Sequence, residues 1–212
     1  MKGSKRAEDS LPKPGEVRLI GGHWKRSRLP VADRPGLRPT PDRVRETLFN
    51  WLGQDLSAWA VLDAFAGSGA LGFEAASRGA QAVVMIESDR ALARSLAGTA
   101  QRLKATQVQV VAADAIVWMG ERAARAHSTA GGASLRKATP CFDLILLDPP
   151  FAAELSEAAW RHAVPLLRRG GWLYLEAPAQ LNFQAPGMEL HRYLKAGAVH
   201  AHLWTCREAP AS

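Results

Sequence analysis

Residues 61–80 read VLDAFAGSGALGFEAASRGA, and this stretch decides the fold. A short apolar run leads into a glycine-rich turn, and a helical pattern follows the turn. Gly67, Gly69 and Gly72 match the spacing GxGxxG, and glycines at such a turn let the backbone bend sharply and approach a ligand closely. The glycines alone do not choose among NAD, FAD and S-adenosylmethionine, whose sites all use a turn of this kind. The stretch therefore predicts a strand, a ligand-binding loop and a helix in succession.

The same alternation of apolar runs and helical stretches continues along the chain. Strands that alternate with helices form βαβ units, and these build a parallel sheet with helices on both faces. Near the C-terminus the order changes, because residues 190–194 and 199–205 are apolar runs separated by four turn residues, which predicts an antiparallel hairpin. We predict an α/β fold with a mostly parallel sheet and a loop at residues 127–140. The predicted strands are Val61–Leu62, Ala82–Ile86, Val108–Ala112, Leu144–Leu147 and Trp172–Leu175.

Asp63 bears on the choice of ligand, because it ends the first strand four residues before Gly67. Beside a pyrophosphate its carboxylate would meet a like charge, at a cost of about 4 kcal/mol per charge pair at about 4 Å and an effective dielectric near about 20. Beside the ammonium group of a methionine moiety the same interaction becomes attractive. The sign of the interaction favours S-adenosylmethionine. The alternative is that Asp63 caps the following helix or accepts hydrogen bonds from loop amides.

Two further acids follow the next two strands. Glu87 closes the second strand, where an acid accepts hydrogen bonds from ribose hydroxyls in nucleotide-binding folds. Asp114 follows the third strand and could accept a hydrogen bond from an adenine amino group, and its alanine neighbours leave space for a flat ring. A lone Asp at a strand end is also a common helix N-cap, so both interpretations of Asp114 stay open.

The stretch FDLILLDPPF, residues 142–151, is the most specific local signal. Pro149 and Pro150 lack N–H donors, so the turn offers only acceptors, namely carbonyl oxygens and the Asp148 carboxylate. Acceptors are what an exocyclic NH₂ group requires, and hydrogen bonds to both of its protons would orient its lone pair for attack on a methyl group. Phe151 offers a face on which an unpaired or flipped base can stack. The alternative is an ordinary proline turn with a core Phe.

The charge of the chain is unevenly distributed. Of 27 Lys and Arg and 20 Asp and Glu, giving a net charge of +7, residues 1–45 hold 12 basic and five acidic groups. The remaining residues are therefore balanced, and the basic segment predicts a polyanionic partner or, alternatively, a solvated tail. Trp24 with its basic neighbours could stack on bases and neutralise phosphates, or could cover the edge of the core. The residues that we assign to contacts with a nucleic acid are Trp24, Lys25, Arg26, Arg28 and Arg43.

We divide the chain into a disordered arm (1–16), a basic RNA-binding extension with a helix (17–52) and a cofactor-binding domain (53–212). A strand starting near Val17 and a helix from about residue 41 to 52 are expected in the extension. Thr40 is the expected N-cap of that helix, and Pro41 its first residue. Two cysteines without a metal-binding pattern and no apolar leader or membrane-spanning run predict a cytoplasmic protein that needs no metal. We also expect a monomer.

Four segments carry a resemblance to a known family: VRLIGGHWKRSRLP (17–30), GLRPTPDRVRETLFNWL (36–52), LDAFAGSGALGFEAASRGA (62–80) and DPPF (148–151). Together they resemble the bacterial 16S ribosomal RNA guanine-N2 methyltransferases, which belong to the class I S-adenosylmethionine-dependent methyltransferases. The resemblance implies a seven-stranded Rossmann-like fold, an rRNA substrate recognised during assembly of the small subunit, and methyl transfer to the guanine 2-amino group. The loop at 127–140 is longer than is usual in that family.

The resemblance also assigns roles by position. It places S-adenosylmethionine against Asp63, Phe65, Gly67, Gly69, Glu87, Asp114, Arg38 and Thr40. It makes Asp148, Pro149, Pro150 and Phe151 the catalytic tetrapeptide. The tetrapeptide alone leaves adenine N6, cytosine N4 or protein glutamine open as acceptors, and a non-catalytic RNA-binding protein is a further alternative. An oxidoreductase fits less well, because neither Tyr174 nor Tyr193 has the spacing to a lysine that a hydride-transfer pair uses.

Overall fold

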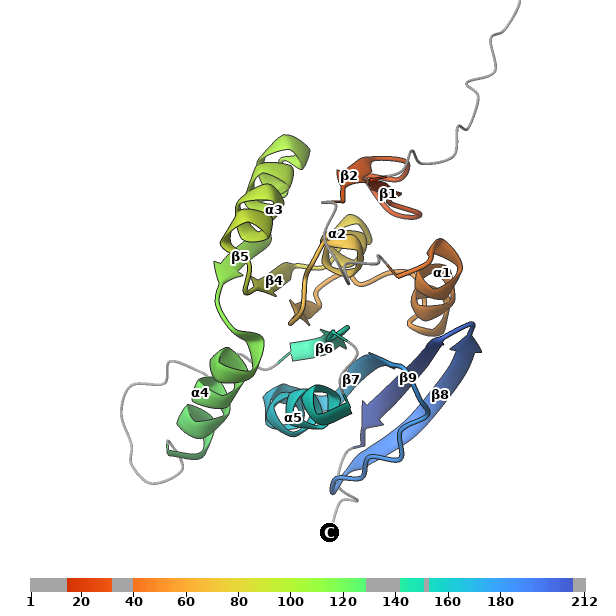
Figure 1. Ribbon diagram of the computed structural model, residues 1–212, viewed down its shortest axis with the longest axis vertical. Helices are drawn as coiled ribbons and strands as arrows, with labels where there is room; N and C mark the ends of the chain where they lie inside the picture. Colours follow the sequence, from red (N-terminus) through yellow and green to blue (C-terminus); the bar gives the residue numbers. More distant parts are fainter. Residues whose placement is uncertain (1–14, 32–39, 129–141, 151–152, 208–212) are drawn as a thin grey trace, which may run out of the picture.

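The computed structural model describes residues 15–31, 40–128, 142–150 and 153–207 (Figure 1). Its main sheet has seven strands in the order β5-β4-β3-β6-β7-β9-β8. All neighbouring strands are parallel except β9, which runs antiparallel to both β7 and β8. The strands are β3 (Ala60–Asp63), β4 (Ala82–Glu87), β5 (Val108–Ala112), β6 (Phe142–Leu147), β7 (Leu167–Ala177), β8 (Met188–Ala196) and β9 (Val199–Cys206).

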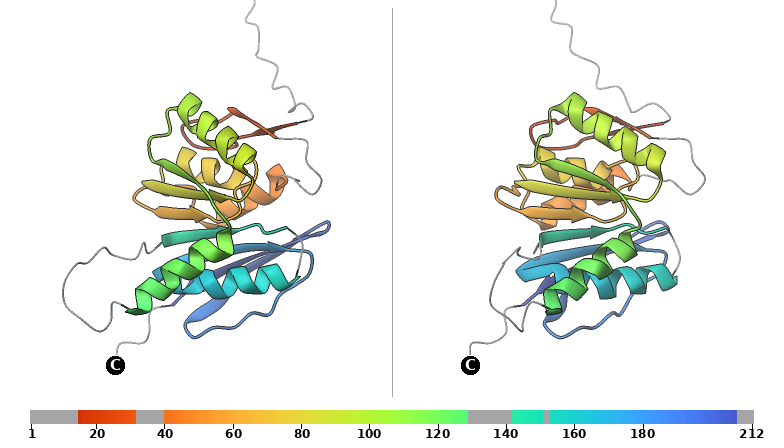
Figure 2. Two further views of the ribbon diagram at one scale, coloured as in Figure 1. Left: turned by 60° about the vertical axis from the view of Figure 1, so that its left-hand side comes forward. Right: turned by 90° about the vertical axis from the view of Figure 1, so that its left-hand side faces the viewer.

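Helices cover both faces of this sheet. The first group is α1 (Asp42–Trp51), α2 (Ala70–Ser77) and α3 (Arg90–Leu103), and the second is α4 (Ala115–Ser128) and α5 (Ala153–Ala163), which a short 3₁₀ turn at Val164–Leu166 follows. In Figure 1 the two groups lie on opposite sides of the strands, and Figure 2 shows the β8–β9 hairpin at the end of the molecule away from α3. The prediction of a mostly parallel, Rossmann-like α/β sheet with a C-terminal antiparallel hairpin is confirmed.

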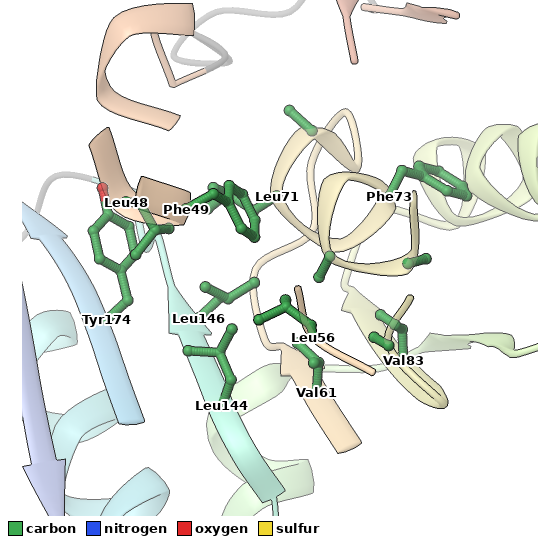
Figure 3. Close-up of a cluster of buried hydrophobic side chains, with 14 of the residues drawn as sticks. Leu48, Phe49, Leu56, Val61, Leu71, Phe73, Val83, Leu144, Leu146 and Tyr174 are labelled. Atoms are coloured by element: carbon green, nitrogen blue, oxygen red, sulfur yellow. The ribbon is translucent and has the colours of Figure 1, made fainter. Parts of the chain in front are cut away.

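The two faces bury separate apolar clusters because successive strand residues point to opposite sides. Val61 of β3 and Leu144 of β6 pack against Leu48 of α1 and Leu71 of α2 on one face, as Figure 3 shows. Leu62 and Ile145, the next residues of the same strands, belong to the cluster that α4 and α5 cover. Near-continuous apolar strands are expected for a parallel sheet that is buried on both faces.

The N-terminal segment packs into the first of these cores. A small hairpin of β1 (Glu16–Arg18) and β2 (Arg28–Pro30) places Val17, Leu19 and Leu29 in the same buried cluster as α1 and α2. In Figure 1 this hairpin lies beside α3. The boundary that we placed between residues 52 and 53 therefore does not separate two cores, and Glu16, which we assigned to the arm, is the first residue of β1.

The start of α1 differs from our prediction. Pro41 occupies the N-cap position, the helix begins at Asp42, and no side chain caps it. Thr40, the predicted N-cap, instead donates a hydrogen bond from its hydroxyl to Asp148, 108 residues away in the chain. The N-cap prediction was wrong because a tertiary contact takes the hydroxyl that a local cap would use. The helix ends at Trp51, one residue before the predicted end.

Candidate active site

The sheet reverses its winding direction at β3, which pairs with β4 on one side and with β6 on the other. In open α/β sheets, ligands bind in the crevice at the carboxyl ends of the strands where this reversal occurs. Asp63 ends β3, Glu87 ends β4, and Asp148 follows β6 directly. The topology thus brings these three of the four predicted acids to one edge of the sheet.

The glycine loop between β3 and α2 has the conformation that its residues require. Gly67 has φ 52° and Gly69 has φ 78°, both in the left-handed region that favours glycine. Gly69 is also the N-cap of α2, and the Ala66 amide donates to the Ile86 carbonyl oxygen at 2.9 Å. The loop is therefore fastened to β4, and its amides lie at the start of a helix, where anionic or polar groups of a ligand are bound.

Asp63 is 1% exposed, and its two oxygens have different surroundings. Oδ2 accepts a hydrogen bond from the Gly72 amide at 2.9 Å, as the amide-binding alternative predicted. Oδ1 is buried and has no hydrogen-bond partner within the described part of the chain. Burial raises the pKa of Asp63 to about 7; the backbone amides of Gly72 and Phe65 oppose this shift, and the charge of Glu87 adds to it. A buried acceptor without a donor fits the ammonium group of S-adenosylmethionine.

Gly72 lets α2 approach β3 closely enough for this contact. A Cβ atom at position 72 would lie 2.5 Å from Met85 Cε and 2.8 Å from Asp63 Oδ2. We expect Gly72→Ala to lower the free energy of unfolding by about 1–3 kcal/mol, as overpacking does, and to weaken cofactor binding by displacing Asp63. Urea denaturation and calorimetric titration with S-adenosylmethionine measure the two effects.

Gly98→Ala is the matched control, because Gly98 lies within α3 and an added Cβ would meet no atom within 4 Å. This substitution is expected to stabilise the protein by about 0.5–1 kcal/mol through helix propensity and to leave cofactor binding unchanged. If Gly72→Ala behaved like Gly98→Ala, close packing of α2 on β3 would not be what positions Asp63.

Glu87 and Asp114 both bind backbone amides in the structure. Glu87 Oε2 accepts from the Gly67 amide at 2.9 Å, and its Oε1 accepts from the Asp89 amide at 2.8 Å. Glu87 thereby joins β4 to the glycine loop while remaining half-buried at the sheet edge. Asp114 Oδ1 accepts from the Val117 amide at 2.9 Å, the N-cap interaction that we named as the alternative. Their contacts with ribose and adenine remain predictions.

Asp148 is partly exposed and accepts a hydrogen bond from the Thr40 hydroxyl at 3.2 Å. Desolvation raises the pKa of Asp148 well above its usual range, the nearby charges of Glu176 and Asp63 raise it further, and the hydrogen bond from Thr40 lowers it. Pro149 is buried and Pro150 is exposed. Phe151 and Arg38, also predicted site residues, lie outside the described residues. Asp148 is thus a hydrogen-bond acceptor with a raised pKa, and it is partly exposed to solvent.

Two site residues escaped the sequence analysis. Glu176 lies near the end of β7 and is 2% exposed, and Tyr174 from the same strand donates its hydroxyl hydrogen to Glu176 Oε1 at 2.8 Å. Figure 3 shows the Tyr174 hydroxyl directed toward α1. A signal was present, since Glu176 is an acid in the otherwise apolar run WLYLEA, but which side chains it faces depends on the packing of α1 on the sheet.

Thr40 is held in place by a buried arginine. Arg45 of α1 is 0% exposed, and its Nε donates to the Thr40 carbonyl oxygen at 3.2 Å. Its guanidinium also lies 3.6 Å from Glu74, which accepts hydrogen bonds from the Ile20 and Gly21 amides. Arg45 is therefore structural, and its charge, which we counted in the basic segment of residues 1–45, does not lie on the surface.

The predicted RNA contacts have mixed surroundings. Lys25, Arg26 and Arg43 are exposed, whereas Trp24 is half-buried against the core, as its alternative predicted. Arg28 forms an ion pair with Glu16 at 2.8 Å. Beyond these residues, α3 forms a basic ridge. The equal numbers of basic and acidic groups after residue 45 gave no reason to expect it. Its exposed cations are Arg90, Arg94 and Arg102, and the helix contains no acidic residue.

The described residues contain no group of three or more His, Cys, Asp or Glu side chains that could hold a metal ion. Among the described helices, none is long and apolar enough to cross a membrane.

Comparisons with known proteins agree with this geometry. The model of a family described as Conserved hypothetical protein 95 matches residues 17–205. The chain is 40% identical over 203 residues to Ribosomal RNA small subunit methyltransferase D of Escherichia coli (strain K12), which covers 92% of each chain. It is also 40% identical over 161 residues to the protein of the same name from Haemophilus influenzae, which covers 75% of this chain and 74% of that one.

Solved structures give the same result. A putative methyltransferase, yhhF, from Escherichia coli superposes with a TM-score of 0.76 at 36% identity, which covers 91% of this chain and 99% of that chain. A putative methylase, HI0767, from Haemophilus influenzae superposes with a TM-score of 0.72 at 33% identity and covers 92% of this chain and 100% of that chain.

Proposed function

The chain belongs to the Conserved hypothetical protein 95 family, and from this premise we propose that it transfers a methyl group from S-adenosylmethionine to the exocyclic N2 amine of a guanine in small-subunit (16S) ribosomal RNA. The observation that carries the proposal is Asp148, a partly exposed acceptor at the point where the sheet reverses, followed by two residues without N–H donors. The relatives named Ribosomal RNA small subunit methyltransferase D support the RNA class. The choice of guanine N2 rests on the resemblance of the segments around Thr40, the glycine loop and Asp148.

S-adenosylmethionine supplies an activated methyl group on a sulfonium centre when it is bound. We assign its ammonium group to Asp63 Oδ1, which is buried without a partner among the described residues. We assign its ribose hydroxyls to Glu87 and its adenine amino group to Asp114. The loop that contains Gly67 and Gly69 would hold the methionine moiety. The donors and acceptors of the site fit the cofactor's functional groups.

The protein's part in the chemistry is to orient the amine and to accept a proton. A carboxyl oxygen of Asp148 and the carbonyl oxygen of Pro149 accept the two hydrogens of the guanine amino group, which aims the nitrogen lone pair at the cofactor side of the site. Once the nitrogen has formed its new bond it carries a positive charge, and it loses a proton to Asp148. A base in a duplex cannot reach this edge of the sheet, so the target is unpaired or flipped.

We infer that RNA phosphates contact a continuous basic surface formed by the β1–β2 hairpin and α3. Arg102 Nη2 donates to the Arg28 carbonyl oxygen at 2.7 Å, which ties the two elements together. Arg90, Arg94 and Arg102 are spaced by multiples of four residues, so they follow one ridge of the helix over about 18 Å. The exposed Lys25 and Arg26 extend this surface across the hairpin.

Salt dependence tests this surface. The double variant Arg90→Gln/Arg94→Gln is expected to bind 16S rRNA fragments about 3–10-fold more weakly at about 0.1 M salt and to reduce the slope of log K against log salt by about 1.4–1.8, because each neutralised phosphate contributes about 0.7–0.9. Arg161→Gln/Arg192→Gln removes two exposed arginines from α5 and β8 and is the matched control. An unchanged slope in the α3 variant would exclude this helix from the RNA interface.

The direct test of the function is transfer of a labelled methyl group. We expect tritiated S-adenosylmethionine to label either naked 16S rRNA or assembled small subunits from a strain that lacks this activity, with the label in N2-methylguanine after nuclease digestion. Label in N6-methyladenine would contradict the assignment of guanine as the target but would agree with the assignment of the protein as an RNA methyltransferase. Label in protein alone would contradict both.

A further inference from the structure

The Thr40 hydroxyl meets the carboxyl group that we assign to catalysis. It donates a hydrogen bond to Asp148 Oδ2 at 3.2 Å, although the two residues are 108 positions apart in the chain. Thr40 is 4% exposed, so little water can reach the hydroxyl and replace this bond. A threonine side chain is short, and its two heavy atoms on Cβ restrict its rotation. The position of the hydroxyl therefore follows from the position of the backbone at residue 40.

A buried arginine fixes that backbone. Arg45 is 0% exposed, and its Nε donates to the Thr40 carbonyl oxygen at 3.2 Å. Its Nη2 donates to the Arg18 carbonyl oxygen at 2.8 Å and to Asp42 Oδ1 at 2.6 Å. The donors of a guanidinium group point in fixed directions within one plane, so these bonds hold their partners in one relative arrangement. Arg45 thus joins the end of β1, the first turn of α1 and the residue that contacts Asp148.

The hydrogen bond from Thr40 makes the two oxygens of the Asp148 carboxyl group different. Resting on the proposed function, we propose that Thr40 is a positioning residue for methyl transfer, which holds Oδ2 of Asp148 so that Oδ1 faces the guanine amine and takes its proton. When the methylated amine loses this proton, the N–H bond breaks and its electron pair stays on the nitrogen. An O–H bond forms on Oδ1, and the Asp148 carboxylate becomes neutral. No electron is gained or lost overall.

The same hydrogen bond favours the ionised form of Asp148. Burial and the charge of Glu176 on β7 raise the pKa of Asp148, the hydrogen bond from Thr40 lowers it, and the charge of Asp63 on β3 raises it further. Tyr174, also on β7, lies near enough for the charge of Asp148 to raise the pKa of its hydroxyl. Methyl transfer needs the carboxylate as a proton acceptor. Loss of the Thr40 hydroxyl is therefore expected to move the ionisation of Asp148 to higher pH.

Thr40→Val removes the hydroxyl with little change of shape and tests both effects. We expect the single-turnover rate of methyl transfer near neutral pH to fall about 10–100-fold, the factor that a hydrogen bond to a charged group is worth. The midpoint at which the rate rises with pH should move upward by about one pH unit. Thr40→Ser keeps the hydroxyl and should retain the rate to within about threefold. The dissociation constant for S-adenosylmethionine should stay within about twofold of wild type in both variants.

Thr47→Val is the matched control, because it makes the same change on α1, where the hydroxyl donates to the Arg43 carbonyl oxygen at an exposed position. It should change neither the rate nor the pH midpoint. Circular dichroism and urea denaturation check the folding of each variant, and Thr40→Ala replaces Thr40→Val if the valine is not accommodated. A folded variant without the hydroxyl that keeps the wild-type rate, or that loses rate with an unchanged pH midpoint, would overturn the proposal. A Thr40→Ser enzyme as slow as Thr40→Val would also overturn it.

The double variant Thr40→Val/Asp148→Ala separates positioning from a general structural role. If Thr40 acts through the Asp148 carboxyl group, loss of its hydroxyl should cost less than about twofold once that group is absent. Effects that multiply, so that the double variant is slower than Asp148→Ala by the full factor of Thr40→Val, would contradict this role. Wild-type enzyme that labels guanine in the same assay shows that the proposed function holds, so failure of the positioning role is distinguishable from failure of the function.

Discussion

Asp148→Ala is expected to lower the rate of methyl transfer at least about 10³-fold, the largest kinetic effect that the site predicts. The substitution removes an oxygen that orients the amine and the group that receives its proton, and each contribution is worth about 10²–10³ in comparable sites. Asp148 accepts a hydrogen bond from the Thr40 hydroxyl, which does not belong to the glycine loop. The dissociation constant for S-adenosylmethionine is therefore expected to stay within about threefold of wild type. Single-turnover assays with labelled cofactor and calorimetry measure the two quantities.

Asp148→Asn divides the effect between its two causes. Asparagine still offers a carbonyl oxygen to the amine but cannot receive a proton, so its rate should fall between those of wild type and Asp148→Ala. Asp55→Ala is the control, because Asp55 is exposed and its hydrogen bonds within the described residues are with Ser57 of its own turn. Turnover of Asp148→Ala near the wild-type rate would remove Asp148 from the chemistry altogether.

Asp63→Asn is expected to stabilise the free protein while weakening cofactor binding. In the folded protein the pKa of Asp63 is about 7, against an ordinary value of 3.8. The folded state holds this proton more tightly than the unfolded chain does. The free energy of unfolding of the wild-type protein therefore falls as the pH rises from about 4 to about 7, and the loss is complete above that range. This loss is at most about 4 kcal/mol. An amide carries no charge at any of these pH values and can still accept from Gly72.

Urea denaturation at two pH values tests this prediction. At pH 8, Asp63→Asn should unfold at a higher urea concentration than wild type, and at pH 4 the difference should nearly disappear. Glu46→Gln makes the same chemical change on an exposed position of α1 and should alter neither value. A destabilised Asp63→Asn protein at pH 8 would mean that the Asp63 carboxylate is well solvated in the fold.

Cofactor binding should respond to Asp63 in the opposite direction. A charge-assisted hydrogen bond to the ammonium group is worth about 1.5–3 kcal/mol, so Asp63→Asn should weaken binding about 10–150-fold at pH 7.5. Wild-type affinity should rise between pH 6 and pH 7.5, because Asp63 must lose its proton before it can pair with the ammonium group, and the variant should show no such rise. A parallel pH dependence in both proteins would place the ammonium group elsewhere.

The glycine loop and the position of Asp63 beside it were predictable because these residues are close together in the chain. Asp63 and the glycine loop lie within one strand–turn–helix unit, and the special backbone angles of Gly67 and Gly69 follow from residue type alone. Even here the local alternatives were partly correct, since Asp63 and Asp114 both bind amides of the helices that follow them. One side chain can make a local cap and still present its other oxygen to a ligand, and spacing alone does not separate these roles.

The groups behind Asp148 were not predictable from spacing. Thr40 has the local signature of a helix cap, and only the packing of α1 against β6 and β7 turns its hydroxyl to Asp148 instead. Glu176 looks like an ordinary acid at a strand end until burial removes it from water. The charge count likewise placed Arg45 in the basic N-terminal segment, although the fold buries it beside Glu74.

The sequence by itself determined the order of strands and helices, the glycine loop, the acids at three strand ends and the acceptor-only turn after β6. Each of these depends on residue type and on neighbours within a few positions. Only the tertiary structure decided which distant groups share a hydrogen bond, which cations reach the surface and which carboxyl groups are buried. Those properties depend on burial and on distances between elements, because a charge or a hydroxyl changes its behaviour when packing replaces water with a particular neighbour.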